Sequence, residues 1–281
     1  MMKMPLLGLL QVCLVFKVTY GFTSRSTCSS SGGSSSSSST RNEFTRTRFC
    51  NNVDSNAKPS TTTLTSTPPP DTSLMRTWDA RYSMEGFAYG TEPNTFLKET
   101  VQSLLLVDPS LPSNAACLML AEGEGRNAVF MAQQGFHATG VDSSAVGMHK
   151  AQGLAEQHQV DITTRVADLQ EFDLGVEEWD VIAGIYCHVP SKIRQRILAD
   201  IPRALKPGGY AIFECYTPLQ PQFHSGGPHS ADLFYTREMF HQAFHDKLHV
   251  VRNTELIRNV REGRYHTGDG AVVQFIGQKA R

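Results

Sequence analysis

A glycine-rich turn at residues 122–128 has the residue types that bind a nucleotide-like ligand through the backbone. It reads Glu122-Gly123-Glu124-Gly125-Arg126-Asn127-Ala128. A glycine at 123 allows a sharp turn, and a glycine at 125 lets a ligand approach the backbone where the next helix begins. The G-x-G-x-x-A spacing, followed by Asp142 at the distance of a ribose-binding acid, also fits the dinucleotide-binding fingerprint. The turn therefore predicts a site for either a nicotinamide cofactor or S-adenosylmethionine.

Two carboxylates help to separate these cofactors. Glu122 directly precedes the first glycine, where its charge would repel a pyrophosphate but can hold hydroxyls or the amino-acid part of S-adenosylmethionine. Asp168 follows the third predicted strand and can accept a hydrogen bond from an adenine amino group. Asp142 and Asp168 could instead be helix N-caps. The residues favour S-adenosylmethionine, and the alternatives are a nicotinamide-dependent oxidoreductase and a non-catalytic cofactor-binding regulator.

Side chains that can act on a substrate follow two later strands. His188 comes directly after the predicted strand 179–186, at the carboxyl edge where ligands bind in parallel sheets. Arg264 and His266 lie in the polar stretch 261–268 and can fix an anion. Either histidine can accept a proton near pH 7. The alternatives are a buried or capping histidine at 188 and an exposed hairpin turn at 261–268.

Alternating strand and helix patterns must position these residues. Strands are predicted over 116–121, 136–141, 162–166, 179–186, 210–216, 248–256 and 271–277, and helices over 126–134, 145–157, 192–205 and 236–245. Short apolar strands that alternate with helices are typical of a parallel sheet covered on both faces. We therefore predict an α/β fold with a Rossmann-like, doubly wound, mostly parallel seven-stranded sheet and an antiparallel last strand pair.

Three motifs together resemble the class I S-adenosylmethionine-dependent methyltransferases. They are the E-x-G-x-G turn at 122, the strand-end acids, and Leu205-Lys206-Pro207-Gly208-Gly209 before the fifth strand. The G-x-G-R-N form of the turn looks like that of the tellurite-resistance methyltransferases and their relatives. The segment Trp78-Asp79-Ala80-Arg81-Tyr82 is similar to a W-x-x-R-Y opening in thiol, halide and thiopurine methyltransferases, where it folds over the cofactor.

The resemblance implies transfer of a methyl group from S-adenosylmethionine to a small-molecule acceptor by in-line displacement. A soft nucleophile, such as a thiol, thioether or chalcogen, needs little base catalysis and is the predicted acceptor. The cofactor-binding residues it implies are Trp78, Glu122, Gly123, Gly125, Arg126, Asn127, Asp142, Ser143, Asp168, Leu169 and Tyr186. The predicted residues of the acceptor site are His188, Arg264 and His266.

The charge and composition of the chain indicate which kinds of partner it can bind. Residues 1–72 carry seven basic and three acidic residues, whereas residues 73–281 carry 19 basic and 24 acidic ones. An acidic domain without a basic stripe argues against nucleic acid as a substrate. The ten histidines and six cysteines lack metal-ligand or disulfide-framework spacing, so no metal is predicted. The domain is expected to be a monomer or homodimer that is not embedded in a membrane.

The first 72 residues are predicted to be a targeting presequence. Residues 1–21 have a basic start and an apolar run too short for a membrane span, which is typical of a signal peptide. Residues 22–72 are rich in Ser and Thr and are predicted to be disordered. The pair resembles the bipartite plastid presequence of algae with secondary plastids, and secretion or a mitochondrial address is the alternative. The methyltransferase domain is predicted over 73–281.

Overall fold

The computed structural model describes residues 72–108, 111 and 114–281. The predicted signal peptide at 1–21 and the Ser/Thr-rich segment up to residue 71 lie outside the described residues, as do Cys13, Cys28 and Cys50. All of the described residues belong to one unit, Ser66–Arg281.

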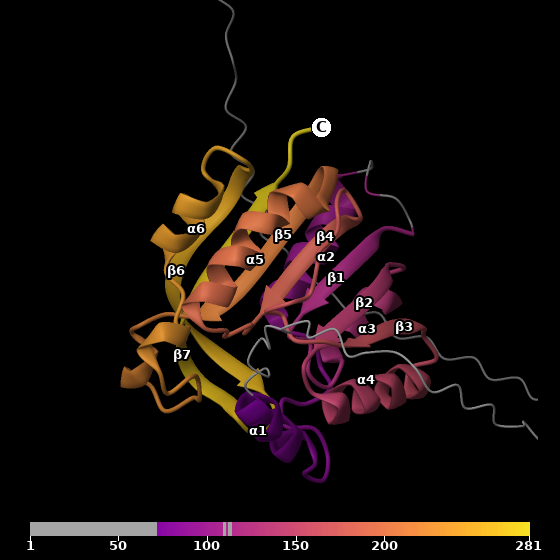
Figure 1. The fold of residues 1–281 in the computed structure, drawn as a ribbon, viewed down its shortest axis with the longest axis vertical. Coiled ribbons are helices and arrows are strands. Elements are labelled where there is room, and N and C mark those ends of the chain that lie inside the picture. The colour runs from indigo at the N-terminus through magenta and orange to yellow at the C-terminus, as the bar shows by residue number, and fades with distance from the viewer. Residues whose placement is uncertain (1–71, 109–110, 112–113) are drawn as a thin grey trace, which may run out of the picture. The chain divides into compact units, whose positions relative to one another are not determined.

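Seven strands form one sheet in the order β3-β2-β1-β4-β5-β7-β6 (Figure 1). They are β1 (Ala116–Leu120), β2 (His137–Asp142), β3 (Ile162–Val166), β4 (Trp179–Ile185), β5 (Leu205–Tyr216), β6 (His249–Glu262) and β7 (His266–Gln278). The first five pair in parallel, whereas β7 runs antiparallel to both β5 and β6. The carboxyl ends of β1, β2 and β4 therefore meet at one edge, which holds residues 122, 142 and 186. This confirms the predicted fold class.

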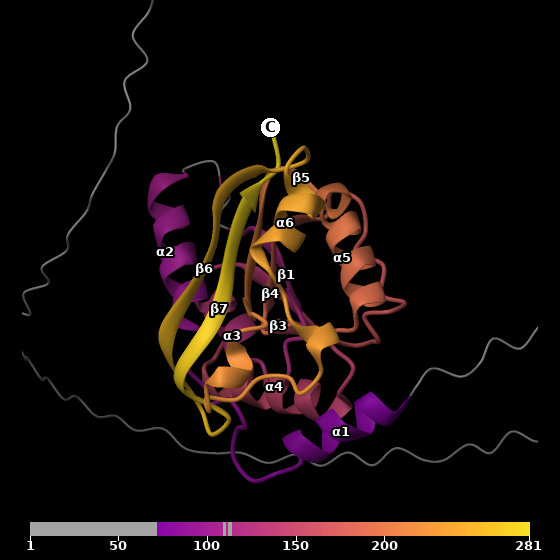
Figure 2. The same cartoon turned by 90° about the vertical axis from the view of Figure 1, so that its left-hand side faces the viewer.

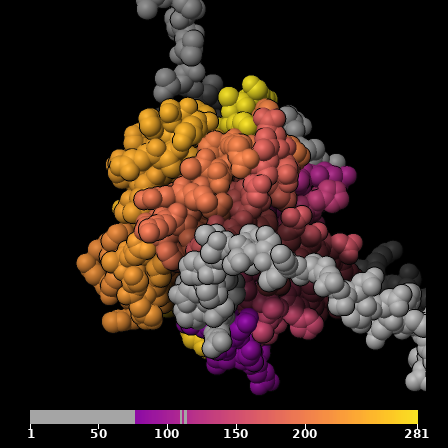
Figure 3. All heavy atoms as spheres, viewed as in Figure 1, coloured from indigo at the N-terminus to yellow at the C-terminus, as the bar shows by residue number. Residues whose placement is uncertain are grey.

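Helices cover both faces of the sheet. They are α1 (Thr72–Tyr82), α2 (Thr95–Val107), α3 (Arg126–Gln133), α4 (Ala145–Gln157), α5 (Ser191–Ala204) and α6 (Arg237–Phe244). Figure 2 shows α2 on one side of the sheet and α5 with α6 on the other, and Figure 3 shows the side chains of α5 and α6 over their face. Two short 3-10 turns, η1 (Gln220–Gln222) and η2 (Ala231–Leu233), lie between β5 and α6. Helix α1 packs against α4.

Burial on both faces explains the apolar strands. Leu118 and Phe213 point into a cluster with α5 and α6, whereas Met119 and Ile212 point into a second cluster with α2 and α3. Successive strand residues face opposite sides, so a strand covered twice must be apolar throughout. Phe240 of α6 shows the close packing, because its ring lies 4.9 Å from that of Phe275.

Two elements differ from their predicted bounds. β5 begins at Leu205 rather than at 210, because Trp179 of β4 pairs with Leu205 before a register shift at Val181. The stretch 261–268, predicted to separate the last strands as a loop, is mostly strand, and only residues 263–265 remain between β6 and β7. The helices α1 and α2 were not predicted.

Candidate functional site

The glycine-rich turn follows β1 in the predicted conformation. Gly123 and Gly125 have φ values of 65° and 93°, and Ala121 just before them is also left-handed at 52°. A non-glycine residue there stores backbone strain, which is typical of functional sites. A Cβ added at Gly125 would lie 2.6 Å from Cα of Ala151, so the contact of the turn with α4 requires glycine.

Two buried carboxylates lie against this turn. Oε1 of Glu122 accepts the N–H groups of Asn127 (2.9 Å) and Ala128 (2.7 Å) and so caps α3. Asp142, at the end of β2, accepts from the N–H of Gly123 (2.9 Å) and of Ser144 (2.8 Å). Burial raises the pKa of Glu122 to about 7 and the pKa of Asp142 to about 6.

These carboxylates fit S-adenosylmethionine better than a dinucleotide. Both acids are desolvated, and the charge of Asp142 also raises the pKa of Glu122, so they favour a ligand that donates hydrogen bonds or carries positive charge. The ribose hydroxyls, the amino group and the sulfonium of S-adenosylmethionine meet this need, whereas a pyrophosphate would add negative charge. The residues at the carboxyl edge therefore suit that cofactor.

Helix α1 covers the turn. The Tyr82 hydroxyl lies 2.6 Å from where a Cβ of Gly123 would be, so the glycine makes room for this ring. Asp79 accepts a 2.5 Å hydrogen bond from Oγ of Ser144, the N-cap of α4. Trp78 stacks on Tyr82 with 5.7 Å between ring centroids. The segment that was expected to fold over the cofactor thus lies beside the turn.

The polar side chains of the turn bind a covering segment, residues 83–94. Oε2 of Glu124 accepts the N–H of Ala88 (2.7 Å), and its Oε1 pairs with Lys150 Nζ (2.9 Å). Oδ1 of Asn127 accepts the N–H of Asn94 (2.9 Å). The side chain of Asn127, predicted to bind the cofactor, therefore holds the segment that packs over the site.

A buried ion network connects the turn to the last strands. Arg126 pairs with Glu262 at 2.6 Å, and Arg258 pairs with Glu214 at 2.6 Å and with Glu262 at 2.9 Å. Asn94 donates to both carboxylates, to Glu214 at 2.7 Å and to Glu262 at 2.8 Å. Two guanidinium groups and two carboxylates balance in charge, which makes their burial tolerable. Arg126 thus connects the glycine-rich turn to β6 through its ion pair with Glu262.

An aromatic cluster of Tyr89, Tyr186, Tyr216 and His266 lies at the ends of β4 and β5. The His266 ring centroid lies 4.5 Å from those of Tyr89 and Tyr186 and 5.3 Å from that of Tyr216. Tyr186 has a left-handed φ of 53°. Nδ1 of His266 is buried without a hydrogen-bond partner among the described residues. Burial, and then the charge of Arg126, holds the pKa of His266 well below its ordinary value.

His188 and Arg264 lie differently with respect to this cluster. Nδ1 of His188 lies 2.8 Å from the Leu233 carbonyl, and its Nε2 is 3.3 Å from the N–H of Tyr216. Burial lowers the pKa of His188 to about 4. Both nitrogens are therefore used within the protein. Arg264 is exposed, and its backbone N–H donates to the Ala88 carbonyl, so its side chain lies outside the buried cluster.

The remaining predicted cofactor residues lie along the same edge. Ser143 is half-buried directly after β2. Asp168 is half-buried after β3 and its Oδ1 accepts the N–H of Gln170 at 2.8 Å, while Leu169 is buried. The Ala167 N–H donates to the Asp142 carbonyl, which brings Asp168 near the predicted ribose acid.

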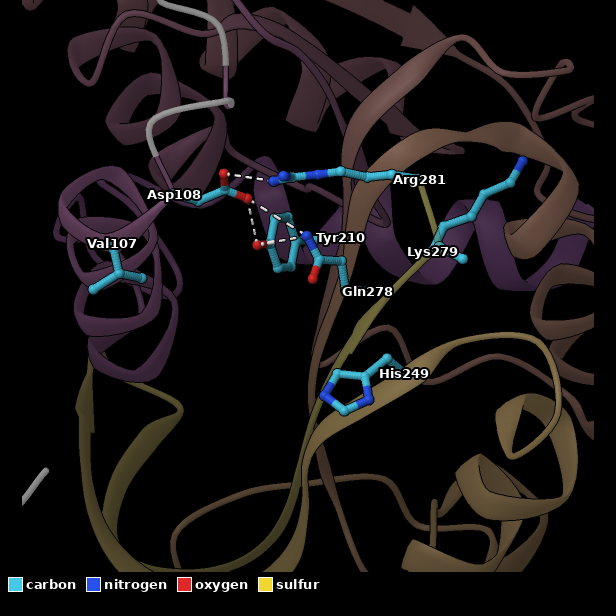
Figure 4. Close-up of a pocket in the computed structure, with 8 residues that line it drawn as sticks. Val107, Asp108, Tyr210, His249, Gln278, Lys279 and Arg281 are labelled. Atoms are coloured by element: carbon cyan, nitrogen blue, oxygen red, sulfur yellow. Dashed lines mark hydrogen bonds and ion pairs between the residues drawn. The ribbon is translucent and has the colours of Figure 1, made fainter. Parts of the chain in front are cut away.

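A cavity of about 510 Å³ lies elsewhere, at the opposite edge of the sheet (Figure 4). There Asp108 binds Arg281 at 2.9 Å and accepts from the Tyr210 hydroxyl at 2.7 Å. This cavity lies where β6 begins at His249 and β7 ends at Gln278, away from the carboxyl end of β5 at residue 216. Within the described ranges, no cluster of three or more His, Cys, Asp or Glu side chains could hold a metal ion. No helix in that part of the chain has the length and apolar character to cross a bilayer.

Several residues of the site were not predicted. They are Tyr89, Asn94, Glu214, Tyr216, Arg258 and Glu262. The sequence did contain a signal for Glu214. This charged residue interrupts the apolar run Tyr-Ala-Ile-Phe-Glu-Cys-Tyr at 210–216, which belongs to a strand buried on both faces. A charge at such a position must have a partner.

Comparisons with known proteins agree with this geometry. Residues 117–209 match a family described as "Methyltransferase domain". No curated protein matches the chain. A solved structure titled for the conversion of a disulfide bond into a thioacetal group during echinomycin biosynthesis is 16% identical, with a TM-score of 0.58, and the match covers 74% of this chain and 92% of that one. TehB from Haemophilus influenzae is 15% identical, with a TM-score of 0.52, and the match covers 65% of this chain and 62% of that one. These structures share the fold.

Proposed function

We propose that this S-adenosylmethionine-dependent methyltransferase methylates a thiol, a thioether or another chalcogen of a small molecule. The observation that carries the proposal is the state of the two histidines at the acceptor end. His188 has both ring nitrogens bonded to backbone groups, and burial lowers the pKa of His266, which makes its ring a weak base. An alcohol or amine acceptor needs a proton acceptor, whereas a soft nucleophile needs little base catalysis.

S-adenosylmethionine is the cofactor of this methyltransferase domain. When bound, it supplies a methyl group already activated on a sulfonium. Glu122 and Asp142 would take its amino and ribose donors, and Gly123 with Gly125 would leave room at the backbone. Asp168 and Leu169 would contact the adenine, as the resemblance to class I enzymes implies.

The chain's own contribution is alignment and exclusion of water. Helix α1 and the covering segment close over the turn through Tyr82 and through the Glu124–Ala88 hydrogen bond. The rings of Tyr186 and Tyr216, with 4.6 Å between their centroids, form an aromatic surface at the carboxyl edge. An acceptor held there in line with the activated methyl group gains most of its rate enhancement from orientation.

A panel of acceptors tests the proposal. The protein is incubated with methyl-labelled cofactor and thiols, thioethers, selenols, amines and phenols of matched size, and S-adenosylhomocysteine affinity is measured alongside. Transfer to sulfur or selenium compounds, with a rate on thioethers that is flat from pH 6 to 8, is expected. Faster transfer to amines or phenols, rising with pH, would contradict it.

We also propose that the acceptor is a small molecule rather than nucleic acid, since residues 73–281 carry an excess of acidic residues. For the location we propose a plastid, on the composition of residues 1–72. A fluorescent protein fused behind these residues should accumulate in plastids of an alga with secondary plastids. Fluorescence in the cytosol would refute the address, and fluorescence in the medium would favour secretion.

A further inference from the structure

Arg81 is held between three aromatic side chains, one of which, Tyr89, belongs to the aromatic cluster. Its guanidinium carbon lies 4.9 Å from the ring centroid of Trp78 and 5.1 Å from that of Tyr265. Its Nη1 donates a 2.8 Å hydrogen bond to the hydroxyl of Tyr89. The three rings come from α1, the covering segment and the turn between β6 and β7. Arg81 is therefore fixed in place by separate elements of the fold.

The charge of Arg81 has no carboxylate partner within 4 Å in the part of the chain that the structure describes. Arg126 and Arg258, by contrast, each pair with buried carboxylates. Among the described residues, one hydrogen bond is accepted from Arg81, so other N–H donors of its planar group remain for a ligand. An oriented, half-buried cation with spare donors is suited to bind an anion.

Helix α1 presents different residues to the cofactor turn and to the aromatic cluster. Asp79 and Tyr82 contact Ser144 and Gly123, on the side of α4. Arg81 instead contacts Tyr89, whose ring lies 4.5 Å from His266. Figure 1 shows α1 between α4 and the turn that joins β6 to β7. The contacts of Arg81 therefore place it on the acceptor side.

The electrostatic surroundings of the aromatic cluster agree with an anionic ligand. The charges of Arg126, Arg81 and Arg258, with His188, all lower the pKa of His266, after the larger effect of burial. Glu214 and Glu262, which face the cluster from β5 and β6, are held by Arg126 and Arg258. Of these three arginines, Arg81 is the one without a carboxylate partner among the described residues, so a ligand can neutralise its charge.

We propose that Arg81 binds a carboxylate of the methyl acceptor, which makes the substrate a small sulfur compound that bears a carboxylate. This specificity rests on the proposed function of sulfur methylation. The reaction then balances without a base when the acceptor is a thioether. A lone pair of its sulfur forms the new bond to the methyl carbon, and the old carbon–sulfur pair stays with S-adenosylhomocysteine. A thiol acceptor loses its proton to solvent.

Matched acceptors separate charge recognition from turnover. The probes are 3-mercaptopropanoate, 3-(methylthio)propanoate and the two corresponding amides, with binding to the protein loaded with S-adenosylhomocysteine measured by calorimetry and methyl transfer measured separately. The carboxylates should bind at least tenfold more tightly than the amides. Arg81→Gln should remove this preference, and Arg81→Lys should keep part of it. The control is Arg261→Gln, at an exposed arginine near the end of β6, which should keep all of it.

The outcomes distinguish the two levels of the proposal. Carboxylate preference in binding without transfer to any sulfur compound would refute the proposed function and leave the role of Arg81 standing. Equal binding of acid and amide, or equal loss of both in Arg81→Gln, would overturn the role of Arg81. A large loss of S-adenosylhomocysteine affinity in Arg81→Gln would overturn it too, because it would assign the arginine to the carboxylate of the cofactor.

Discussion

Arg126 and Glu262 form a buried ion pair, with 2.6 Å between Nη2 and Oε2, that joins the cofactor turn to the end of β6. Arg126 follows the second glycine of the turn, and Glu262 is the last residue before the turn that carries Tyr265. Asn94 of the covering segment donates to the same glutamate. One carboxylate thus fixes three segments that surround the site.

Glu262→Gln should therefore destabilise the fold by about 3 kcal/mol, because it leaves a buried guanidinium without its counter-charge. Urea unfolding at pH 7 measures the change. The control is Glu177→Gln, whose ion pair with Lys279 is half exposed and whose loss should cost less than about 0.5 kcal/mol. A similar loss of unfolding free energy in the two variants would show that the buried ion pair stabilises the fold no more than the exposed one does.

Gly125→Ala should weaken both folding and cofactor binding, since the added carbon would collide with the backbone of Ala151 and the residue has a left-handed φ. Gly153 offers a matched control within α4, because a Cβ there meets nothing within 4 Å. Gly153→Ala should stabilise the protein by about 0.5–1 kcal/mol. Thermal unfolding and titration with S-adenosylhomocysteine check both variants. A tolerated Gly125→Ala would refute the tight contact.

Asp142→Ala should weaken S-adenosylhomocysteine binding by about 1–3 kcal/mol, by removing the acceptor for the ribose hydroxyls. Calorimetry at pH 7 measures this affinity. Asp173→Ala, at an exposed acid of the loop before β4, is the control and should leave affinity unchanged. Unchanged affinity in Asp142→Ala would remove this residue from the site.

His188 should make stability depend on pH. Its pKa falls from 6.5 to about 4 on folding, so the unfolded chain takes up a proton first as the pH drops. The neutral ring therefore stabilises the fold above pH 6.5, and this contribution is lost as the pH falls from 6.5 towards 4. Between pH 7 and 5 the loss is about 2 kcal/mol, at 1.36 kcal/mol per unit of pKa.

Urea unfolding of the wild type and of His188→Gln at both pH values isolates this contribution from those of other groups. The variant should show the smaller loss between pH 7 and pH 5. An identical pH dependence in the two proteins would mean that His188 is not held neutral. If His188→Gln also leaves S-adenosylhomocysteine affinity within about twofold, the histidine acts away from the cofactor.

The sequence predicts the local motifs and their order along the chain. It does not predict which distant segments contact one another. The turn at 122–126, the acid at 142 and the strand before Tyr186 follow from glycine chemistry and apolar runs, and the structure confirms their places at one edge. Helix α2 also had a signal, since Asn94 accepts from the Leu97 N–H as an N-cap and the buried residues recur at helical spacing.

Two partnerships carried no local signal. Glu214 and Arg258 are 44 residues apart and lie on strands separated by β7, so their side chains meet across that strand. Arg126 reads as a ligand-binding residue beside a glycine, but its buried partner is 136 residues away. A side chain's role in such cases depends on strand order, which a single sequence does not specify locally.

The place of β7 also has a consequence for synthesis on the ribosome. β7 follows every other strand in the chain but pairs with β5, so a nascent chain that ends before residue 266 exposes the edge of β5 to the cell. That edge belongs to a strand whose residues from Tyr210 to Tyr216 are all buried in the folded protein, and exposed apolar strand edges promote aggregation. Chaperone binding to ribosome-bound chains should therefore persist until β7 has emerged and closed the sheet.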